Sequence, residues 1–192
     1  MRRLACPFLY LAWLLAGELS IPGSRLGADP GEALVLYLGE WSLRLLLATL
    51  LVSSLSRWLH NPGVIGIRRM VGLFAFTAVC CHFLAYLGFL AGFDWSLIRE
   101  DLVERRYITV GFLALLLLVP LAWTSTRGWQ RRLGRRWKQL HRLVYVIVGL
   151  ALLHLFWLTK DGYGEAVLML ACYLLLIGER LVTYRVRRVA RG

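Results

Sequence analysis

The sequence predicts an all-α integral membrane protein, a bundle of six transmembrane helices with both termini in the cytoplasm. Three observations support this fold class. Hydrophobic residues make up 59% of the 192 residues, against about 45–50% in ordinary globular domains. The apolar residues form long runs, and the formal net charge of +12 comes from cations gathered between those runs. Because six helices use most of the chain, we expect a single domain over residues 1–192.

Six apolar runs approach the length of about 20 residues that a helix needs to cross a bilayer, and no internal repeat stands out among them. The first run follows Met1-Arg2-Arg3, so a cleaved signal peptide is the alternative to a retained helix there. Glu18 near its end and the lack of an Ala-x-Ala site favour the retained helix. The predicted spans are Leu4–Ile21, Leu34–Leu55, Met70–Phe93, Tyr107–Trp123, Leu140–Leu158 and Glu165–Val182.

The distribution of cations gives the orientation. Segments 1–3, 57–69, 124–142 and 180–192 carry 17 of the 23 Lys and Arg residues and none of the 11 acids; only Glu179, next to the last segment, lies on the same side. These segments share one side of six alternating spans, and the positive-inside rule places that side in the cytoplasm. We therefore interpret the basic charge as a topology signal and not as a nucleic-acid-binding surface.

Several kinds of chemistry are unsupported by the sequence. The loops are too short for a soluble catalytic domain, and no Gly-rich nucleotide fingerprint occurs. Four cysteines form no Cys-x-x-Cys pair, so neither a zinc site nor a dithiol motif is indicated; we expect them to be small buried apolar residues. We assign no catalytic residue and expect the chemistry inside the bundle or on a partner. The cysteines are Cys6, Cys80, Cys81 and Cys172.

The histidines are the most informative residues, because ionisable groups inside a membrane are costly unless paired or functional. His82 lies 12 residues beyond Met70, and His154 lies 14 residues beyond Leu140. At 1.5 Å per residue, both lie about 18–21 Å from the cytoplasmic ends of their helices. Two imidazoles at matching depth predict the two axial ligands of one haem iron. The alternative for each is a polar residue that bonds to a neighbouring helix.

Small residues surround His82 at helical spacing, namely Ala75, Ala78 and Ala85. This alanine stripe leaves room for a flat macrocycle. The alternative is close helix–helix packing, which membrane proteins commonly achieve through small residues.

The other two histidines differ. His141 lies 13 residues before His154, so it is a candidate ligand for a second haem. The residue 14 positions before His82 is Arg68, which does not normally ligate haem. His141 is therefore either a second haem ligand or an interfacial histidine, and both interpretations stay open. His60 lies beside Asn61-Pro62-Gly63, and we expect it in a solvated loop.

Two charged loops have alternative interpretations. The segment RGWQRRLGRRWKQLHR, residues 127–142, is typical of a topology signal that also contacts lipid headgroups. Its alternative is a docking surface for a phosphate group, such as a flavin phosphate, or for an acidic redox partner. On the outer side we expect an ordinary solvated loop, with partner docking as the alternative; its acids are Asp94, Glu100, Asp101 and Glu104.

The segments IRRMVGLFAF, CHFLAYL, RRYITVGF and TSTRGWQRRLGRRWKQLHRLVY resemble the MsrQ (formerly YedZ) family of bacterial haem-binding membrane subunits. The resemblance extends from about Gly27 to Trp157, and the broader group is the ferric-reductase-like transmembrane domain. The family's motif histidines fall on His82, His141 and His154. Wider relatives carry two histidines on each of two helices, whereas the third span here has only His82.

The resemblance implies a multi-pass protein of the bacterial inner membrane that binds b-type haem and flavin mononucleotide (FMN). It also implies that electrons pass from quinol to MsrP, a periplasmic molybdopterin enzyme that reduces methionine sulfoxide in oxidised envelope proteins. Substrate reduction is then expected on the partner. The alternative is a transmembrane metal or oxygen reductase fed by a cytosolic flavoreductase. A transporter or haem-free scaffold is least favoured, because intramembrane charges are scarce.

Overall fold

The computed structural model describes residues 29–61, 63–159 and 162–189, and this part of the chain contains helices but no strand. The predicted first span, Leu4–Ile21, lies outside the described residues. The elements are α2 (Pro30–Trp58), α3 (Val64–Ala85), the π-helical turn η1 (Tyr86–Leu90), α4 (Trp95–Glu104), α5 (Arg106–Trp123), α6 (Arg127–Leu133), α7 (Arg135–Leu140), α8 (Leu143–Leu158) and α9 (Gly164–Val189).

In the described part of the chain, five helices are long and apolar enough to cross a membrane, which confirms the all-α class there and the second to sixth predicted spans as helices. The number of six spans and the cytoplasmic position of the termini stay predictions. The five helical stretches are Pro30–Trp58, Gly66–Leu90, Arg106–Trp123, Arg135–Leu158 and Gly164–Val186.

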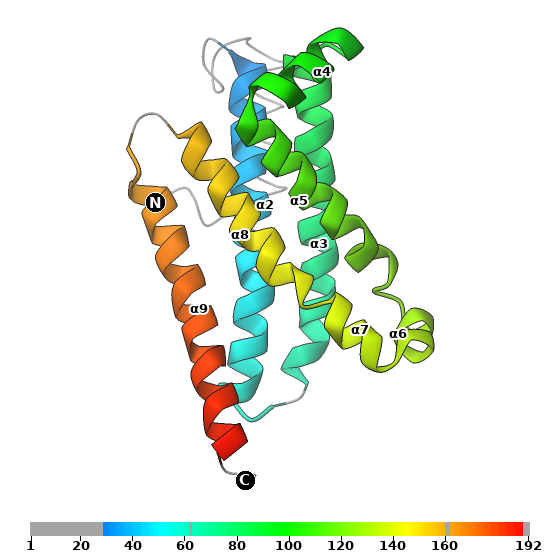
Figure 1. Cartoon of the computed structure of the whole chain (residues 1–192), viewed down its shortest axis with the longest axis vertical. Coiled ribbons are helices and arrows are strands. Elements are labelled where there is room, and N and C mark those ends of the chain that lie inside the picture. Colours follow the sequence, from blue (N-terminus) through cyan, green and yellow to red (C-terminus); the bar gives the residue numbers. More distant parts are fainter. Residues whose placement is uncertain (1–28, 62, 160–161, 190–192) are drawn as a thin grey trace, which may run out of the picture.

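Consecutive spans run in opposite directions, so the basic segments lie towards the same end of the bundle (Figure 1). Segments 57–69 and 124–142 and the C-terminal part of α9 lie towards one end of the bundle, which we call the basic end. The start of α2 and the whole of α4 lie at the opposite end, which we call the far end. This common placement is what the charge distribution predicted for the segments that the structure describes.

Helix starts follow ordinary capping chemistry. Asp29 caps α2, accepting a hydrogen bond from the backbone N–H of Glu32 at 3.0 Å, and Pro30 occupies the first turn. Pro suits this position because its missing N–H has no partner inside the helix. Between α6 and α7 the backbone turns at Gly134, whose φ of +48° favours glycine. The predicted basic loop 127–142 is therefore two short helices joined by a glycine.

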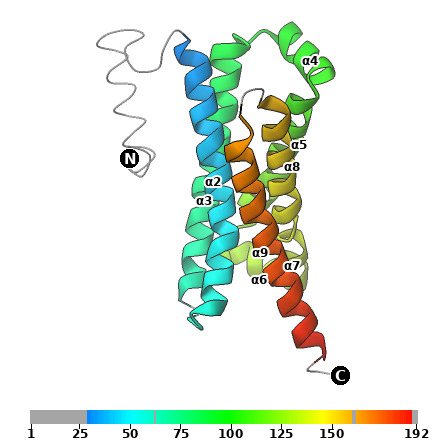
Figure 2. The ribbon, with the colours of Figure 1, turned by 90° about the vertical axis from the view of Figure 1, so that its left-hand side faces the viewer.

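The core lies where α2 meets α8, and Leu50, Ile147 and Val148 are almost completely buried there. Figure 2 shows α2 and α3 side by side along most of their length. Much of the outer surface is apolar, as expected of helices that face lipid. Cys81 and Cys172 lie on this surface, so the expectation that the cysteines are buried was wrong for these two side chains.

The acidic outer loop is a helix, α4, with one of its carboxylates buried. Asp101 is only 5% exposed. It accepts a hydrogen bond from the Tyr86 hydroxyl at 2.7 Å and pairs with the guanidinium of Arg105 at 3.0 Å. Asp101 therefore fastens α4 to η1 and does not belong to an exposed acidic surface.

We predict that Tyr86→Phe loosens α4. Removing one partner of a buried carboxylate costs about 1–3 kcal/mol. Amide hydrogen exchange over residues 94–104 is therefore expected to accelerate about tenfold or more. Tyr163→Phe, which removes the hydroxyl of an exposed tyrosine, is the control. Unchanged exchange in Tyr86→Phe would show that Asp101 does not hold this helix.

Candidate functional site

Two histidines from different helices meet inside the bundle. The ring centroids of His82 on α3 and His154 on α8 are 6.3 Å apart, and the ring planes are nearly perpendicular at 82°. Both side chains are half-buried. The expectation that the two imidazoles lie at matching depth and come together is confirmed.

Each imidazole is oriented by a backbone carbonyl of a neighbouring helix. Nδ1 of His82 lies 2.9 Å from the carbonyl oxygen of Val35 on α2, and Nδ1 of His154 lies 2.6 Å from that of Tyr107 on α5. Because a carbonyl only accepts, each Nδ1 carries the proton and donates. This leaves Nε2 of each ring with a lone pair, which is the arrangement of histidines that ligate metals.

A glycine packs against each imidazole. A Cβ built on Gly39 would lie 3.0 Å from Cε1 of His82, and one built on Gly111 would lie 2.8 Å from Nδ1 of His154. Real Cβ atoms rarely come so close to another heavy atom. Any larger residue at these positions would push the ring away from its carbonyl, so glycine is required by the close approach.

These contacts reveal an internal repeat. In each set the histidine follows its carbonyl partner by 47 residues, and the glycine lies one helical turn after that partner. The second set stands 72 residues after the first throughout. The helix pairs α2–α3 and α5–α8 therefore present the same three groups at the same spacing, which we interpret as an internal repeat of the parallel kind. The sequence alone did not predict this repeat, nor the roles of Val35, Gly39, Tyr107 and Gly111. The equal spacing from glycine to histidine in the two sets was the one feature of the sequence that indicated it.

The geometry of the pair fits axial ligation of haem iron. Two imidazoles that bind one metal ion from opposite sides, through bonds of about 2.0 Å, have ring centres roughly 6 Å apart. Among the described residues, no group of three or more His, Cys, Asp or Glu side chains could hold a metal ion. Two imidazoles alone are a poor zinc site, because structural zinc takes four protein ligands. Haem iron brings four nitrogens of its own and requires only axial ligands.

The alanine stripe serves helix packing. Ala85 packs with Val35 and Leu38 of α2, and Ala75 belongs to the main core. Ala78 is also buried. The small side chains thus allow α3 to approach α2 closely, which brings His82 within reach of the Val35 carbonyl.

His141 is held differently from the other two histidines. Its ring stacks on Trp137 with centroids 4.1 Å apart, and its Nε2 lies 3.2 Å from the Thr124 hydroxyl. That hydroxyl donates its proton to the carbonyl of Pro120 at 2.6 Å. Nε2 of His141 must therefore donate to Thr124, so this nitrogen has no free lone pair in the structure. The residue 72 positions earlier is Arg69, so the repeat supplies no second ligand opposite His141.

The structure places the remaining sequence candidates on the surface. His60 is exposed after the end of α2, as expected of a loop histidine. Most arginines of segment 127–142 are exposed as well. Glu100 and Glu104 are exposed on α4, at the far end.

Comparison with known proteins identifies the family of the chain. The family described as Ferric reductase like transmembrane component matches residues 38–152, a range that contains His82, Tyr107 and His141 but begins after Val35 and ends just before His154. No solved structure matches the chain.

Three similar proteins share one name, Protein-methionine-sulfoxide reductase heme-binding subunit MsrQ. The protein from Caulobacter vibrioides is 44% identical over 91% of this chain and 81% of its own length. The one from Xanthomonas campestris pv. campestris strain 8004 is 46% identical over 91% and 80%. The one from Rhodospirillum rubrum is 48% identical over 88% and 83%.

Proposed function

Because the chain belongs to the MsrQ family and contains a ferric reductase like transmembrane domain, we propose that it is a haem b electron-transfer subunit of the bacterial inner membrane. It takes electrons from quinol and passes them to MsrP, the periplasmic molybdopterin enzyme that reduces methionine sulfoxide in oxidised envelope proteins. The observation that carries the proposal is the pair His82 and His154, each oriented by a backbone carbonyl.

The side chains and backbone of this site have distinct roles. His82 and His154 would hold the haem through Nε2, and the carbonyls of Val35 and Tyr107 fix the tautomer of each ring. A hydrogen bond from Nδ1 raises the basicity of the ligand, which favours the ferric state. Bound haem would supply a one-electron relay, and ligation by both histidines would suit electron transfer more than oxygen chemistry, because it would leave the iron no free site for oxygen.

We place substrate reduction on MsrP and assign no catalytic residue to this chain. His82 and His154 lie close together and would supply one pair of ligands, so we propose one haem at this site. His141 stays a candidate ligand for a second haem and would have to give up its bond to Thr124 to serve as one through Nε2. The family resemblance also implies FMN. The exposed segment 127–142 alone does not identify the residues that would bind it.

The direct test is electron transfer with purified protein. A reduced quinol analogue is expected to reduce the haem, giving a b-type difference spectrum, and MsrP with methionine sulfoxide is expected to reoxidise it. Reoxidation by ferric chelates or oxygen without MsrP would favour the alternative, a transmembrane metal or oxygen reductase. A colourless preparation after full haem supplementation would exclude both functions.

We predict that His82→Ala and His154→Ala each abolish the low-spin haem signal, because either change removes one axial ligand. His141→Ala is expected to leave that signal in place. Electron paramagnetic resonance and a pyridine haemochrome count per chain measure both effects. Loss of the low-spin signal in His141→Ala alone would show that the ligand pair is assigned wrongly, and two haems per chain would establish a second site.

We predict that Gly111→Ala raises the midpoint potential of the haem, because the new Cβ displaces His154 from the Tyr107 carbonyl. Losing a hydrogen bond of about 1 kcal/mol corresponds to roughly 40 mV for a one-electron couple. Gly72→Ala is the matched control, since its nearest contact is Thr49 Cγ2 at 3.8 Å. Equal potentials in the two variants would show that Gly111 has no part in orienting the ligand.

A further inference from the structure

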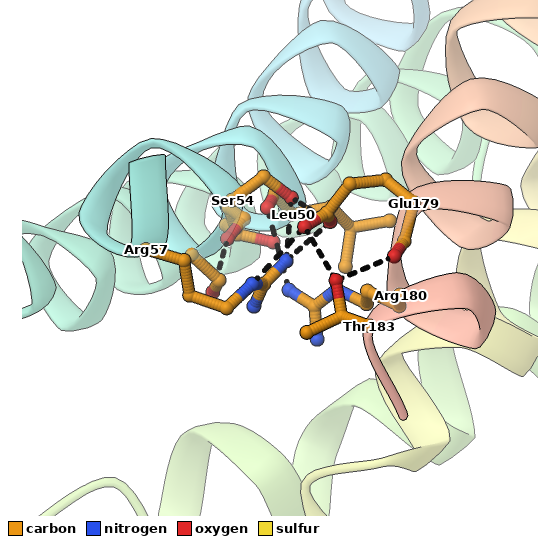
Figure 3. Close-up of polar contacts among 8 residues, drawn as sticks. Leu50, Ser54, Arg57, Glu179, Arg180 and Thr183 are labelled. Carbon is orange, nitrogen blue, oxygen red and sulfur yellow. Dashed lines mark hydrogen bonds and ion pairs between the residues drawn. The ribbon is translucent and has the colours of Figure 1, made fainter. Parts of the chain in front are cut away.

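Two polar networks lie in the bundle apart from the histidine pair. In the network between α2 and α9, towards the basic end, Glu179 accepts two hydrogen bonds from Arg57 and one from the Ser54 hydroxyl (Figure 3). The Thr183 hydroxyl adds a further contact at 3.3 Å. These bonds fill the acceptor sites of the carboxylate and join two helices, so this network has a structural role.

The second network lies at the far end, where α4 connects α3 to α5 (Figure 1). Its centre is Asp101, which is 5% exposed and accepts a hydrogen bond from the Tyr86 hydroxyl at 2.7 Å. The other oxygen of Asp101 pairs with Arg105 at 3.0 Å, and the Arg105 side chain is 53% exposed. Arg105 also donates to the Tyr107 hydroxyl at 3.5 Å. The network therefore runs from between the helices, at Tyr86, to the surface, at Arg105.

This network begins close to the histidine pair. Tyr86 follows His82 by four residues, which is one helical turn and about 6 Å along the axis. Tyr107, on the other side of the network, has the carbonyl that orients His154. A group bound at the Tyr86 hydroxyl is thus near the place where haem iron would be held, and Asp101 connects it to the far-end surface.

Three aromatic rings form a cluster beside this hydroxyl. The Tyr86 ring stacks on Phe83, with centroids 6.3 Å apart and planes at 26°. Phe83 in turn lies 5.8 Å from the ring of Phe112 on α5. All three side chains are half-buried, so part of each ring faces the lipid around these spans. Flat rings with one hydroxyl among them suit an aromatic ligand that has a polar group of its own.

We propose that quinol binds to this aromatic cluster between α3 and α5, with its ring against Phe83 and Phe112 and one hydroxyl donating to Tyr86 Oη. The Tyr86 oxygen has lone pairs left after donating to Asp101, so it can accept. Quinol is an aromatic diol that diffuses in the bilayer, so it reaches the cluster from lipid. This inference rests on the proposed function, because it names the site of the electron donor and makes Asp101 the acceptor of its protons.

Oxidation of quinol to quinone breaks two O–H bonds and releases two electrons and two protons. The electrons go one at a time to ferric haem at His82 and His154 and on to the partner. With each electron, Tyr86 takes a proton from the quinol hydroxyl and gives its own to Asp101, so only Asp101 changes charge. Neutral Asp101 no longer holds Arg105, whose exposed side chain turns to water and lets the proton leave at the far end. The quinol ring turns to present its second hydroxyl for the second step.

The first arm of the test measures proton transfer. Holoprotein in phosphatidylcholine nanodiscs is mixed with decylubiquinol, and haem reduction is followed by stopped-flow absorbance. Asp101→Asn keeps an oxygen that accepts from Tyr86 but cannot take a proton. It is expected to slow haem reduction at saturating quinol about 100-fold or more, with the half-saturating quinol concentration unchanged. Glu104→Gln, which changes an exposed carboxylate of the same helix, is the matched control and should react at the rate of the parent protein.

The second arm measures binding. Phe112→Leu removes a flat ring without touching Asp101. It is expected to raise the half-saturating quinol concentration about tenfold and to leave the rate at saturation unchanged, because stacking contributes about 1 kcal/mol beyond the area buried. Phe74→Leu changes an exposed phenylalanine of α3 and should behave as the parent protein does. Equal half-saturating concentrations in these two variants would remove the aromatic cluster from the proposal.

Haem and fold are monitored in the same preparations. Dithionite reduces haem without quinol, and amide exchange over residues 94–104 reports on α4. Equal rates in Asp101→Asn and Glu104→Gln would overturn the site and leave the proposed function intact. Slowing that comes only with faster exchange over residues 94–104 would make Asp101 structural and overturn its role. A parent protein whose haem is reduced by dithionite but not by decylubiquinol would instead contradict the proposed function.

Discussion

The arrangement of this bundle depends on one unusual interaction, a histidine that donates to a backbone carbonyl of the neighbouring helix. Inside an α-helix that carbonyl already accepts from the N–H four residues later. A carbonyl oxygen has a second lone pair, but the side chain four residues later normally covers it. At Val35 and Tyr107 that later residue is Gly39 or Gly111. The glycine uncovers the carbonyl and lets the histidine reach it.

The same interaction explains why the two helix pairs approach so closely. Each hydrogen bond joins a helix that runs away from the basic end to one that runs towards it, α3 to α2 and α8 to α5. In lipid, apolar side chains gain little by leaving the surrounding hydrocarbon, so packing and polar contacts hold helices together. The structural unit of two helices is thus also the unit that orients one ligand. Two copies placed against each other make the complete site.

The remaining span, α9, is fixed by charge. It runs parallel to α2 and meets it in two ion pairs, Arg44 with Glu165 and Arg57 with Glu179. On α2 these arginines are 13 residues apart, or about 20 Å along the axis, so the two pairs fix the direction as well as the position of α9. Arg180 follows Glu179 directly and therefore enters the bundle beside a carboxylate that is already neutralised.

The sequence predicted the features that depend on composition and on the depth of a residue along its helix. Apolar length located five spans, and the matched depths of His82 and His154 predicted that their rings meet. It could not find the carbonyl partners, because Val35 and Tyr107 act through the backbone and share no side-chain chemistry. The repeat escaped notice for the same reason, since only Gly and His are common to the two sets. His141 matched the family motif, yet its bond to Thr124 depends on where α7 packs, which spacing does not determine.

The depth of the histidine pair bears on how electrons enter. His82 lies 14 residues beyond Arg68 on α3, about 21 Å along the helix axis from the basic end. A quinol that diffuses in the plane of the bilayer would approach the histidine pair from lipid, so the proposed route requires no relay from the basic end. A second haem at His141 would be required only if electrons entered at the basic end. The haem count per chain is therefore a measurement of the route as well as of the site.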